Sequence, residues 1–499
     1  MISKNIRDLR ARKGISQDRL SKLTDLSLNT IVKVESGKNS NPTIDTLSRI
    51  ARVFNVRVDE LIKVWVIVAL AGMFSLCYAE EQARVITLST GIQSVLKDNR
   101  LIKISFSDKD MALEDSLAAR SALLPHINGN LSETFLKFQP QAKFDTVKAF
   151  TSQKQYFSFG FDVYQTLFDF GKSISNYKAA KEIVRASAAN LESVKRVAVL
   201  EFITAYFDLL EADKMIAVAE KQVESLSSYL NDVEDLYKQG VVVDNELLPA
   251  KVRLADARQK LISARNARDI AAAALNNILS LPLNTRIAVE DVSMQPPELP
   301  SMEQAWDTAQ TQRQEIVFFA DQIKASSLSE RAKAVENFPA LFADAGYSYT
   351  ENTYQVHQDN TFLELGAKIN FYDGGAARAQ LLKERARRTQ LTRQLDKLIE
   401  DIKFEIQDSY TGLKNAGEKV TVAKEALGQA EENVRFNRAK YAAGSATATE
   451  VLEAIAMQTS AQTNFYSSDY EVKRGYAKFM YSIGMDLALI YERMESAKK

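Results

Sequence analysis

The sequence is poor in the residues that form metal centres and covalent cross-links. Among its 499 residues there is one cysteine, Cys77, and there are two histidines, His126 and His357. One thiol cannot form a disulfide within the chain, and so few thiol and imidazole groups cannot complete a zinc site. We therefore expect no metal and no cofactor, and we look for a function other than metal-dependent catalysis.

Proline and glycine are also scarce, and their scarcity predicts long helices. The 68 residues between Gly171 and Gly240 contain neither, and as one helix they would extend about 100 Å. The runs at 178–199 and 377–402 are rich in alanine, in other helix-forming residues and in charges of both signs. Helices of this length must pack on one another or on other subunits, as in a coiled coil.

Neither sign of charge dominates, since the chain contains 64 Lys and Arg residues and 64 Asp and Glu residues. Residues 1–63, however, carry 13 basic and 7 acidic residues, a net charge of +6, so the remainder carries −6. A basic segment suits contact with phosphates, although a charged helix face is often only solvated.

An uncharged, mostly apolar run covers residues 64–79, VWVIVALAGMFSLCYA. It follows Lys63 and ends in small residues, which is the layout of a secretory signal peptide cleaved after Ala79. Its 16 residues fall short of the roughly 20 that a transmembrane helix needs. An uncleaved anchor or a buried helix is the alternative interpretation.

Residues 1–63 are predicted to form four or five short helices. Apolar residues recur there at helical spacing, with breaks at Gly14, Gly37 and Pro42. The segment with Ser16-Gln17, Glu35-x-Gly37 and Asn41-Pro42-Thr43 resembles the lambda-repressor and Cro-like helix-turn-helix family.

This resemblance implies sequence-specific DNA binding by a five-helix domain. It places Ser27 at the start of the recognition helix, which enters the major groove. It implies that bases are contacted by Leu28, Asn29, Thr30 and Lys33, and phosphates by Gln17 with Lys38 or Asn39. Asp25 stands where the turn of that family usually has glycine, and aspartate tolerates a left-handed backbone better than most residues.

The rest of the chain is internally duplicated. At an offset of 204 residues, Phe168-Asp169-x-Gly171 recurs as Tyr372-Asp373-x-Gly375, and Tyr237-x-x-Gly240 recurs as Tyr441-x-x-Gly444. At an offset of 214, Leu88 pairs with Met302 and Pro125 with Pro339. We therefore predict two homologous halves, 80–295 and 296–499, that meet at Pro296, Pro297 and Pro300 and differ by ten residues in one short segment.

Two strands are predicted ahead of each long helix. Apolar and polar residues alternate at 157–163, 341–349 and 363–371, and less regularly at 127–138. Segments of about ten residues with one apolar and one polar face are typical of outer-membrane barrels, although a soluble half-buried sheet gives the same pattern. Four strands cannot close a barrel that needs about eight. Several chains must share one barrel, and three chains would supply twelve strands.

With these features, residues 80–499 resemble the TolC-type outer-membrane efflux proteins. The resemblance rests on the duplication, on Leu123-Leu124-Pro125-His126 and Phe338-Pro339-Ala340 before the strands, and on the turns at 167–171 and 371–375. It implies a mainly α fold with a small β part, in which a homotrimer forms a twelve-stranded barrel in outer-membrane lipid and a coiled-coil tunnel in the periplasm. It also implies docking on a periplasmic adaptor and an inner-membrane pump, as an exit duct rather than an enzyme.

A duct needs a gate, and the resemblance places one at the periplasmic tip. Glu450 and Glu453 share one helical face. Three copies would bring six such carboxylates to one axis, where like charges raise each other's pKa and favour cations; solvated glutamates are the alternative. Further gate residues implied are Asn245, Glu246 and Tyr441.

The gate motif departs from the family at one position, because Ala446 replaces an arginine that family members often carry there. The gate is then held by hydrogen bonds from Tyr441, or it rests more loosely. Gly171, Gly374 and Gly375 are predicted to be structural turns, where strand becomes helix and a side chain does not fit. Gly240 and Gly444 are predicted to be structural as well and to bend the helix pairs at the tip.

Two other hypotheses remain open. The chain could be a transcription regulator tethered to a membrane by residues 64–79 with an envelope-sensing body, or a coiled-coil structural protein of the envelope. A DNA-binding domain must stay in the cytoplasm, whereas a barrel subunit must be exported. We expect one of three resolutions: a start assigned too early, so that the product begins near Val64; a fusion of two genes; or cleavage after Ala79.

Overall fold

A computed structural model describes residues 2–37, 42–54, 56, 58, 61, 84–240, 243–292 and 299–496. The chain divides into two compact units, residues 1–82 and 83–499, which we describe separately. Three predictions fall outside the described residues: the signal segment 64–79, the DNA contact by Lys38 or Asn39, and the prolines Pro296 and Pro297.

The first unit is a small helical domain, as predicted. Its described helices are α1 (Ile2–Arg12), α2 (Gln17–Thr24), α3 (Leu28–Glu35) and α4 (Ile44–Phe54). They pack around one apolar cluster that includes Ile6, Leu20 and Ile31. The Ser27 hydroxyl accepts a hydrogen bond from the Thr30 N–H and caps α3, and Asp25 has the left-handed φ of 54° expected of the turn.

The second unit repeats its helices with the predicted offsets. The first copy contains α7 (Leu88–Asp98), α8 (Arg100–Ser121), α9 (Lys172–Lys238) and α10 (Asp244–Ile278). The second contains α11 (Met302–Gln312), α12 (Gln314–Ala334), α13 (Ala376–Ala442) and α14 (Ala448–Ser482). The helices α9 and α13 have 67 residues each, and α10 and α14 have 35 each. The structure therefore confirms the duplication.

Four long strands join the two copies into one antiparallel sheet. They are β2 (His126–Phe135), β5 (Gln155–Phe168), β7 (Ala340–Thr350) and β8 (Asp359–Lys368), in the order β2-β5-β7-β8. Their register gathers apolar residues on one face, with Leu131 opposite Phe159 and Ala343 opposite Leu365, and polar residues on the other, with Asn128 opposite Asp162. The predicted strands and their alternation are confirmed.

The ten extra residues of the first copy lie between its two strands. Segment 136–154 contains a small hairpin, β3 (Gln141–Phe144) and β4 (Val147–Phe150), where the second copy has only segment 351–358. No pattern in the sequence predicted this hairpin. The same holds for the parallel pair β1 (Arg84–Ile86) and β6 (Ile287–Val289), and for the last helix, α15 (Leu487–Ser496).

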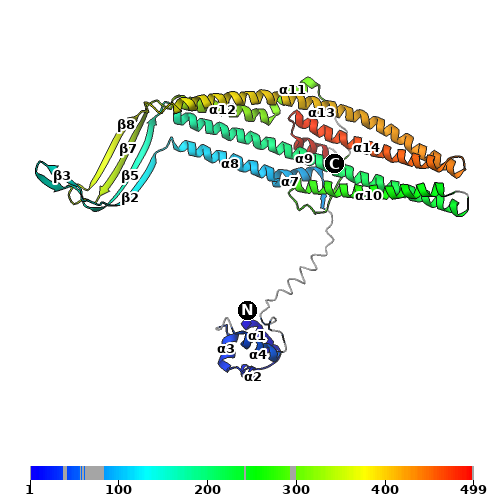
Figure 1. The fold of residues 1–499 in the computed structure, drawn as a ribbon, viewed down its shortest axis with the longest axis horizontal. Coiled ribbons are helices and arrows are strands. Elements are labelled where there is room, and N and C mark those ends of the chain that lie inside the picture. The colour runs from blue at the N-terminus through cyan, green and yellow to red at the C-terminus, as the bar shows by residue number, and fades with distance from the viewer. Residues whose placement is uncertain are drawn as a thin grey trace. The chain divides into compact units, whose positions relative to one another are not determined.

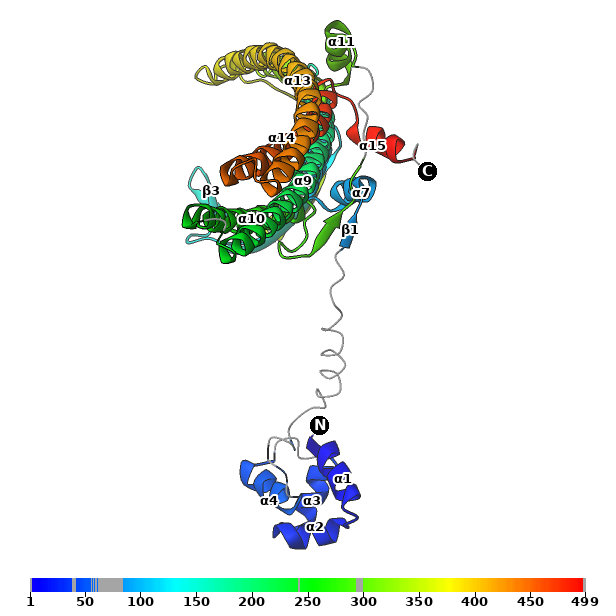
Figure 2. The same cartoon turned by 90° about the vertical axis from the view of Figure 1, so that its right-hand side faces the viewer.

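The long helices form a curved wall that extends from the sheet (Figures 1 and 2). Next to the sheet the helices contact each other in the order α8, α9, α12, α13. Toward the far end the order is α10, α9, α14, α13. The edges of the wall are therefore α8 and α10 on one side and α13 on the other. In the part of the chain that the structure describes, no helix combines the length and the apolar character needed to cross a membrane.

Midway along the wall, two equivalent side chains fix the short helices to the ends of the returning ones. In the first copy, the Asn99 amide donates to the Ile278 carbonyl at 3.0 Å. In the second, Arg313 donates to the Ser482 carbonyl at 3.1 Å. Arg313 also donates to Glu405 at 3.0 Å and to Glu315 at 3.1 Å, although it is only 5% exposed. The same junction is thus neutral in one copy and ionic in the other.

Candidate functional site

The candidate gate lies at the tip of the wall, where the long helices turn back. The turn between α13 and α14 contains Gly444 with a left-handed φ of 71°, and Gly240 at the end of α9 has a φ of 72°. At the opposite end of the long helices, Gly171 and Gly375 precede α9 and α13 with φ values of 82° and 90°. Such values favour glycine because a Cβ would clash with its own backbone.

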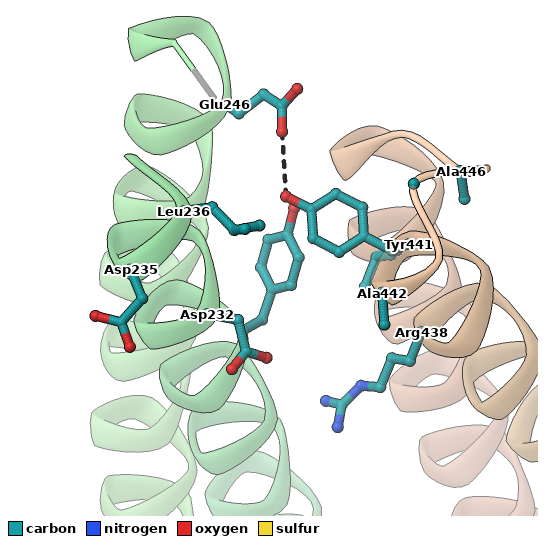
Figure 3. Close-up of a pocket in the computed structure, with 11 residues that line it drawn as sticks. Asp232, Asp235, Leu236, Glu246, Arg438, Tyr441, Ala442 and Ala446 are labelled. Carbon is teal, nitrogen blue, oxygen red and sulfur yellow. Dashed lines mark hydrogen bonds between the residues drawn. The ribbon is translucent and has the colours of Figure 1, made fainter. Parts of the chain in front are cut away.

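A hydrogen bond links the two copies at this tip. The Tyr441 hydroxyl on α13 donates to Glu246 Oε2 on α10 at 3.1 Å (Figure 3). The Tyr441 ring packs against Tyr229 of α9, with 5.6 Å between ring centroids. Because the three residues lie on three helices, the contact ties the hairpin of the first copy to the hairpin of the second.

An apolar cluster supports this hydrogen bond from below. Tyr229 is 3% exposed and belongs to a buried cluster drawn from all four tip helices, with Leu247 from α10, Val434 from α13 and Val451 from α14. Burial raises the pKa of Tyr229 and of Tyr441, and the Glu246 carboxylate adds to both shifts. Both hydroxyls therefore stay protonated at neutral pH, so Tyr441 can donate to Glu246.

A cavity of about 670 Å³ opens beside the two tyrosines. Its lining includes Ala446, so the small side chain at this position borders open space. Arg438 also lines it (Figure 3), and it donates to the Ser225 carbonyl of α9 at 3.3 Å. The sequence analysis missed Tyr229 and Arg438. Arg438 lies three residues before Tyr441, one helical turn away, and that spacing was the available signal.

Glu450 has a local role in the single protomer. Its carboxylate accepts the Thr447 N–H at 2.6 Å, and the Thr447 hydroxyl accepts the Glu450 N–H at 3.3 Å. This is a capping box that begins α14. The hydrogen bonds from Thr447 hold the pKa of Glu450 below its ordinary value.

The other predicted gate residues lie on the surface of the protomer. Glu453 and Asn245 are both exposed. The expected rise in carboxylate pKa concerns three protomers together, and it stays a prediction.

The predicted DNA-binding residues that the structure describes lie on two helices of the first unit. Leu28, Asn29 and Lys33 are exposed on α3, and Thr30 is half-buried. The Gln17 amide donates to Glu35 Oε2 at 2.7 Å, and Arg10 donates to the other oxygen of this buried carboxylate, also at 2.7 Å. Gln17 therefore takes part in an internal network, which the sequence analysis did not foresee.

Comparison with known proteins gives two separate matches. A family described as "Outer membrane efflux protein" matches residues 91–280 and 306–484, and one described as "Helix-turn-helix" matches residues 6–61. Outer membrane protein TolC of Escherichia coli K12 is 19% identical over 436 residues, covering 83% of this chain and 84% of its own length.

Two further relatives match one part of the chain each. An uncharacterized HTH-type transcriptional regulator of Archaeoglobus fulgidus is 43% identical over 56 residues, covering 11% of this chain and 79% of its own length. The crystal structure of the Campylobacter jejuni CmeC outer membrane channel superimposes with a TM-score of 0.72 at 15% identity, covering 82% of this chain and 89% of that one.

Proposed function

The chain belongs to the outer membrane efflux protein family, and we propose that residues 80–499 form a trimeric exit duct, gated at its periplasmic tip. The single observation that carries the proposal is that both edges of the helical wall expose large apolar side chains. Ile104 of α8 and Val252 of α10 are 58% and 67% exposed on one edge, and Phe404 of α13 is 74% exposed on the other. Large apolar side chains exposed along both edges support a contact there with further copies of the chain.

The sheet supports the same conclusion. Strands β2 and β8 each have one neighbour among the described strands, so each has an unpaired edge. An unpaired edge cannot face lipid, because the backbone groups there would find no hydrogen-bond partner. Three copies joined edge to edge would close a barrel of twelve strands, with the apolar face of the sheet toward lipid and the polar face toward the lumen.

The gate is the tip, where Tyr441 and Glu246 hold the two hairpins of each protomer together. In the trimer, Glu450 and Glu453 of each protomer face the axis, with Asn245 beside Glu246, and these residues select cations. The duct is passive and carries no catalytic residues. Its substrate is chosen by an inner-membrane pump, to which a periplasmic adaptor connects the tip.

Residues 1–63 form a DNA-binding module whose exposed α3 residues enter the major groove. This second function is favoured by the helix-turn-helix match over residues 6–61. DNA and the outer membrane lie in different compartments, so we infer that the two units have separate functions. Either two genes have been fused, or cleavage after Ala79 separates the two parts. Selection from random DNA by residues 1–63 would reveal an operator, and selection of none would refute this function.

One experiment tests the exit duct. The chain is expressed and the membranes are fractionated. The membrane-inserted product is sequenced from its N-terminus, and the molecular mass of its oligomer is measured in detergent. We expect an outer-membrane trimer that begins at Glu80 and conducts ions in planar bilayers. Full-length chain found only in the inner membrane would overturn the proposal and favour a membrane-tethered regulator.

A further inference from the structure

A polar cavity, which we call the wall cavity, lies near the sheet, where α12 runs between α9 and α13 (Figure 1). Its volume is about 230 Å³, well above the roughly 30 Å³ that one water molecule occupies in the liquid. Protein interiors pack densely, so an opening of this size between helices calls for an occupant. Its polar lining consists of Asn176 of α9, Gln322, Ser326 and Ser329 of α12, and Glu384 and Arg387 of α13.

These six side chains have no hydrogen-bond or ion-pair partner among the described residues. Ser326 is only 5% exposed, and its Oγ is buried without a partner. The Oε2 of Glu384 is buried without a partner as well. A buried polar atom that is left unpaired costs stability. The two oxygens therefore indicate that a polar molecule occupies the wall cavity.

The neighbouring charges, in contrast, are paired. Glu330 of α12 contacts Arg385 and Arg388 of α13 at 2.9 and 3.3 Å. Glu384 and Arg387 lie three residues apart, on one face of the same helix, yet they form no ion pair with each other or with other described residues. The wall cavity thus contains one carboxylate and one guanidinium without counter-charges.

The repeat itself does not require these two charges. At the offset of 204, Glu384 and Arg387 correspond to Ala180 and Ile183, which line the same cavity from α9. The first copy therefore builds the equivalent helical turn from uncharged side chains. The charges of the second copy are not needed to form the helix, and they are specific to this cavity.

A free carboxylate and a free guanidinium in one cavity match a small molecule that carries both charges. An ammonium group has three N–H donors, which the Glu384 carboxylate and the Ser326 hydroxyl can accept. A guanidinium binds a carboxylate through two parallel hydrogen bonds, and Arg387 offers these donors. Because Ser326 is buried and Arg387 is exposed, the ammonium group belongs at the inner end and the carboxylate at the mouth.

We propose that the wall cavity is a binding site for a small zwitterion with an ammonium and a carboxylate group, that is, a free amino acid with a short side chain. Glu384 and Ser326 bind the ammonium group, and Arg387 binds the carboxylate. The bound molecule joins α9 of the first copy to α12 and α13 of the second, so it stabilises the folded chain. The site lies within one protomer and does not require the trimer.

Calorimetric titration of the full-length chain in a non-ionic detergent tests this site, with glycine, L-alanine and L-serine as probes. We expect at least one of the three to bind and to raise the thermal midpoint of unfolding. Acetate and ethylammonium carry one charge each and should do neither at the same concentration. Glu384→Gln and Arg387→Gln each remove one charge and should weaken binding by about tenfold. Ser326→Ala removes only a hydroxyl and should weaken binding less.

Glu400→Gln and Arg393→Gln are matched controls at exposed positions of α13, and both should bind like the wild type. Circular dichroism without ligand shows whether each variant is folded. If none of the three probes binds the wild type, the wall cavity holds water alone and the proposal is wrong. It is equally wrong if the folded Glu384, Arg387 and Ser326 variants bind as tightly as the wild type. Either result leaves the exit duct standing, because the duct is tested by oligomeric state and conductance.

Discussion

The two copies of the repeat share their helix boundaries but differ in chemistry at equivalent positions. The first copy fixes its midpoint junction with the neutral Asn99, and the second uses the buried Arg313. The first copy begins α10 without a side-chain cap, and the second begins α14 with the Thr447–Glu450 box. Duplication thus preserved the backbone, while the side chains diverged at the junctions and at the tip.

Removing the junction side chain from each copy gives the largest expected difference. Arg313→Met leaves the carboxylates of Glu315 and Glu405 without their buried partner, which costs about 3–5 kcal/mol. Asn99→Ala removes a helix cap and costs about 1–2 kcal/mol. Urea unfolding followed by circular dichroism measures both. Adding Glu315→Gln and Glu405→Gln to Arg313→Met recovers part of the lost free energy of unfolding. If Arg313→Met and Asn99→Ala cost the same, the distinction between an ionic and a neutral junction is wrong.

The turn that follows each returning helix gives the next largest difference. Gly484 has a φ of 80°, and an added Cβ would lie 2.9 Å from the Gln312 Cβ. Gly484→Ala therefore costs about 1–3 kcal/mol. Ser280, its counterpart in the first copy, already carries a side chain at a φ of 59°, so Ser280→Ala serves as the control. A thermal midpoint that is unchanged in Gly484→Ala would contradict the expectation.

At the tip, the comparison concerns Tyr441 and its first-copy counterpart Tyr237. Tyr441→Phe removes the hydrogen bond to Glu246, worth about 1 kcal/mol, and we expect a higher open probability in planar bilayers. Tyr237 is 40% exposed, and Tyr237→Phe is expected to leave the open probability unchanged. If the Tyr441 variant and the wild type have the same open probability, Tyr441 is not part of the gate.

The smallest effect concerns pH at the start of α14. Because the pKa of Glu450 is lowered in the folded protein by hydrogen bonds from Thr447, its stabilisation is present above the ordinary carboxyl pKa and is lost as pH falls through the folded value. Hydrogen exchange of the first-turn amides of α14 should accelerate, after correction for intrinsic rates, as pH falls below about 4.5. Glu450→Gln keeps an acceptor without titrating, and its corrected exchange should not change with pH.

The parts of the fold that were predictable are those encoded locally. Glycine and proline spacing predicted the bounds of α9, the offset of 204 transferred them to α13, and alternation predicted the four long strands, because these signals repeat along the chain. The β1–β6 pair and the Arg313 network join segments that are far apart in sequence, so no local pattern predicted them. At the tip, the spacing placed Glu450 on one helical face with Glu453, but it did not distinguish a carboxylate that lines a pore from one that caps a helix. Its bond to Thr447 depends on where α14 begins.

The sheet register has a consequence for movement. Because β5 pairs with β7 inside each chain, the two repeats of a protomer cannot separate at the sheet without breaking backbone hydrogen bonds. A ring of three such chains would have an approximately sixfold outline over a true threefold symmetry. Opening of the tip would then leave the sheet paired and would separate the two hairpins within each protomer, where the Tyr441–Glu246 hydrogen bond has to break.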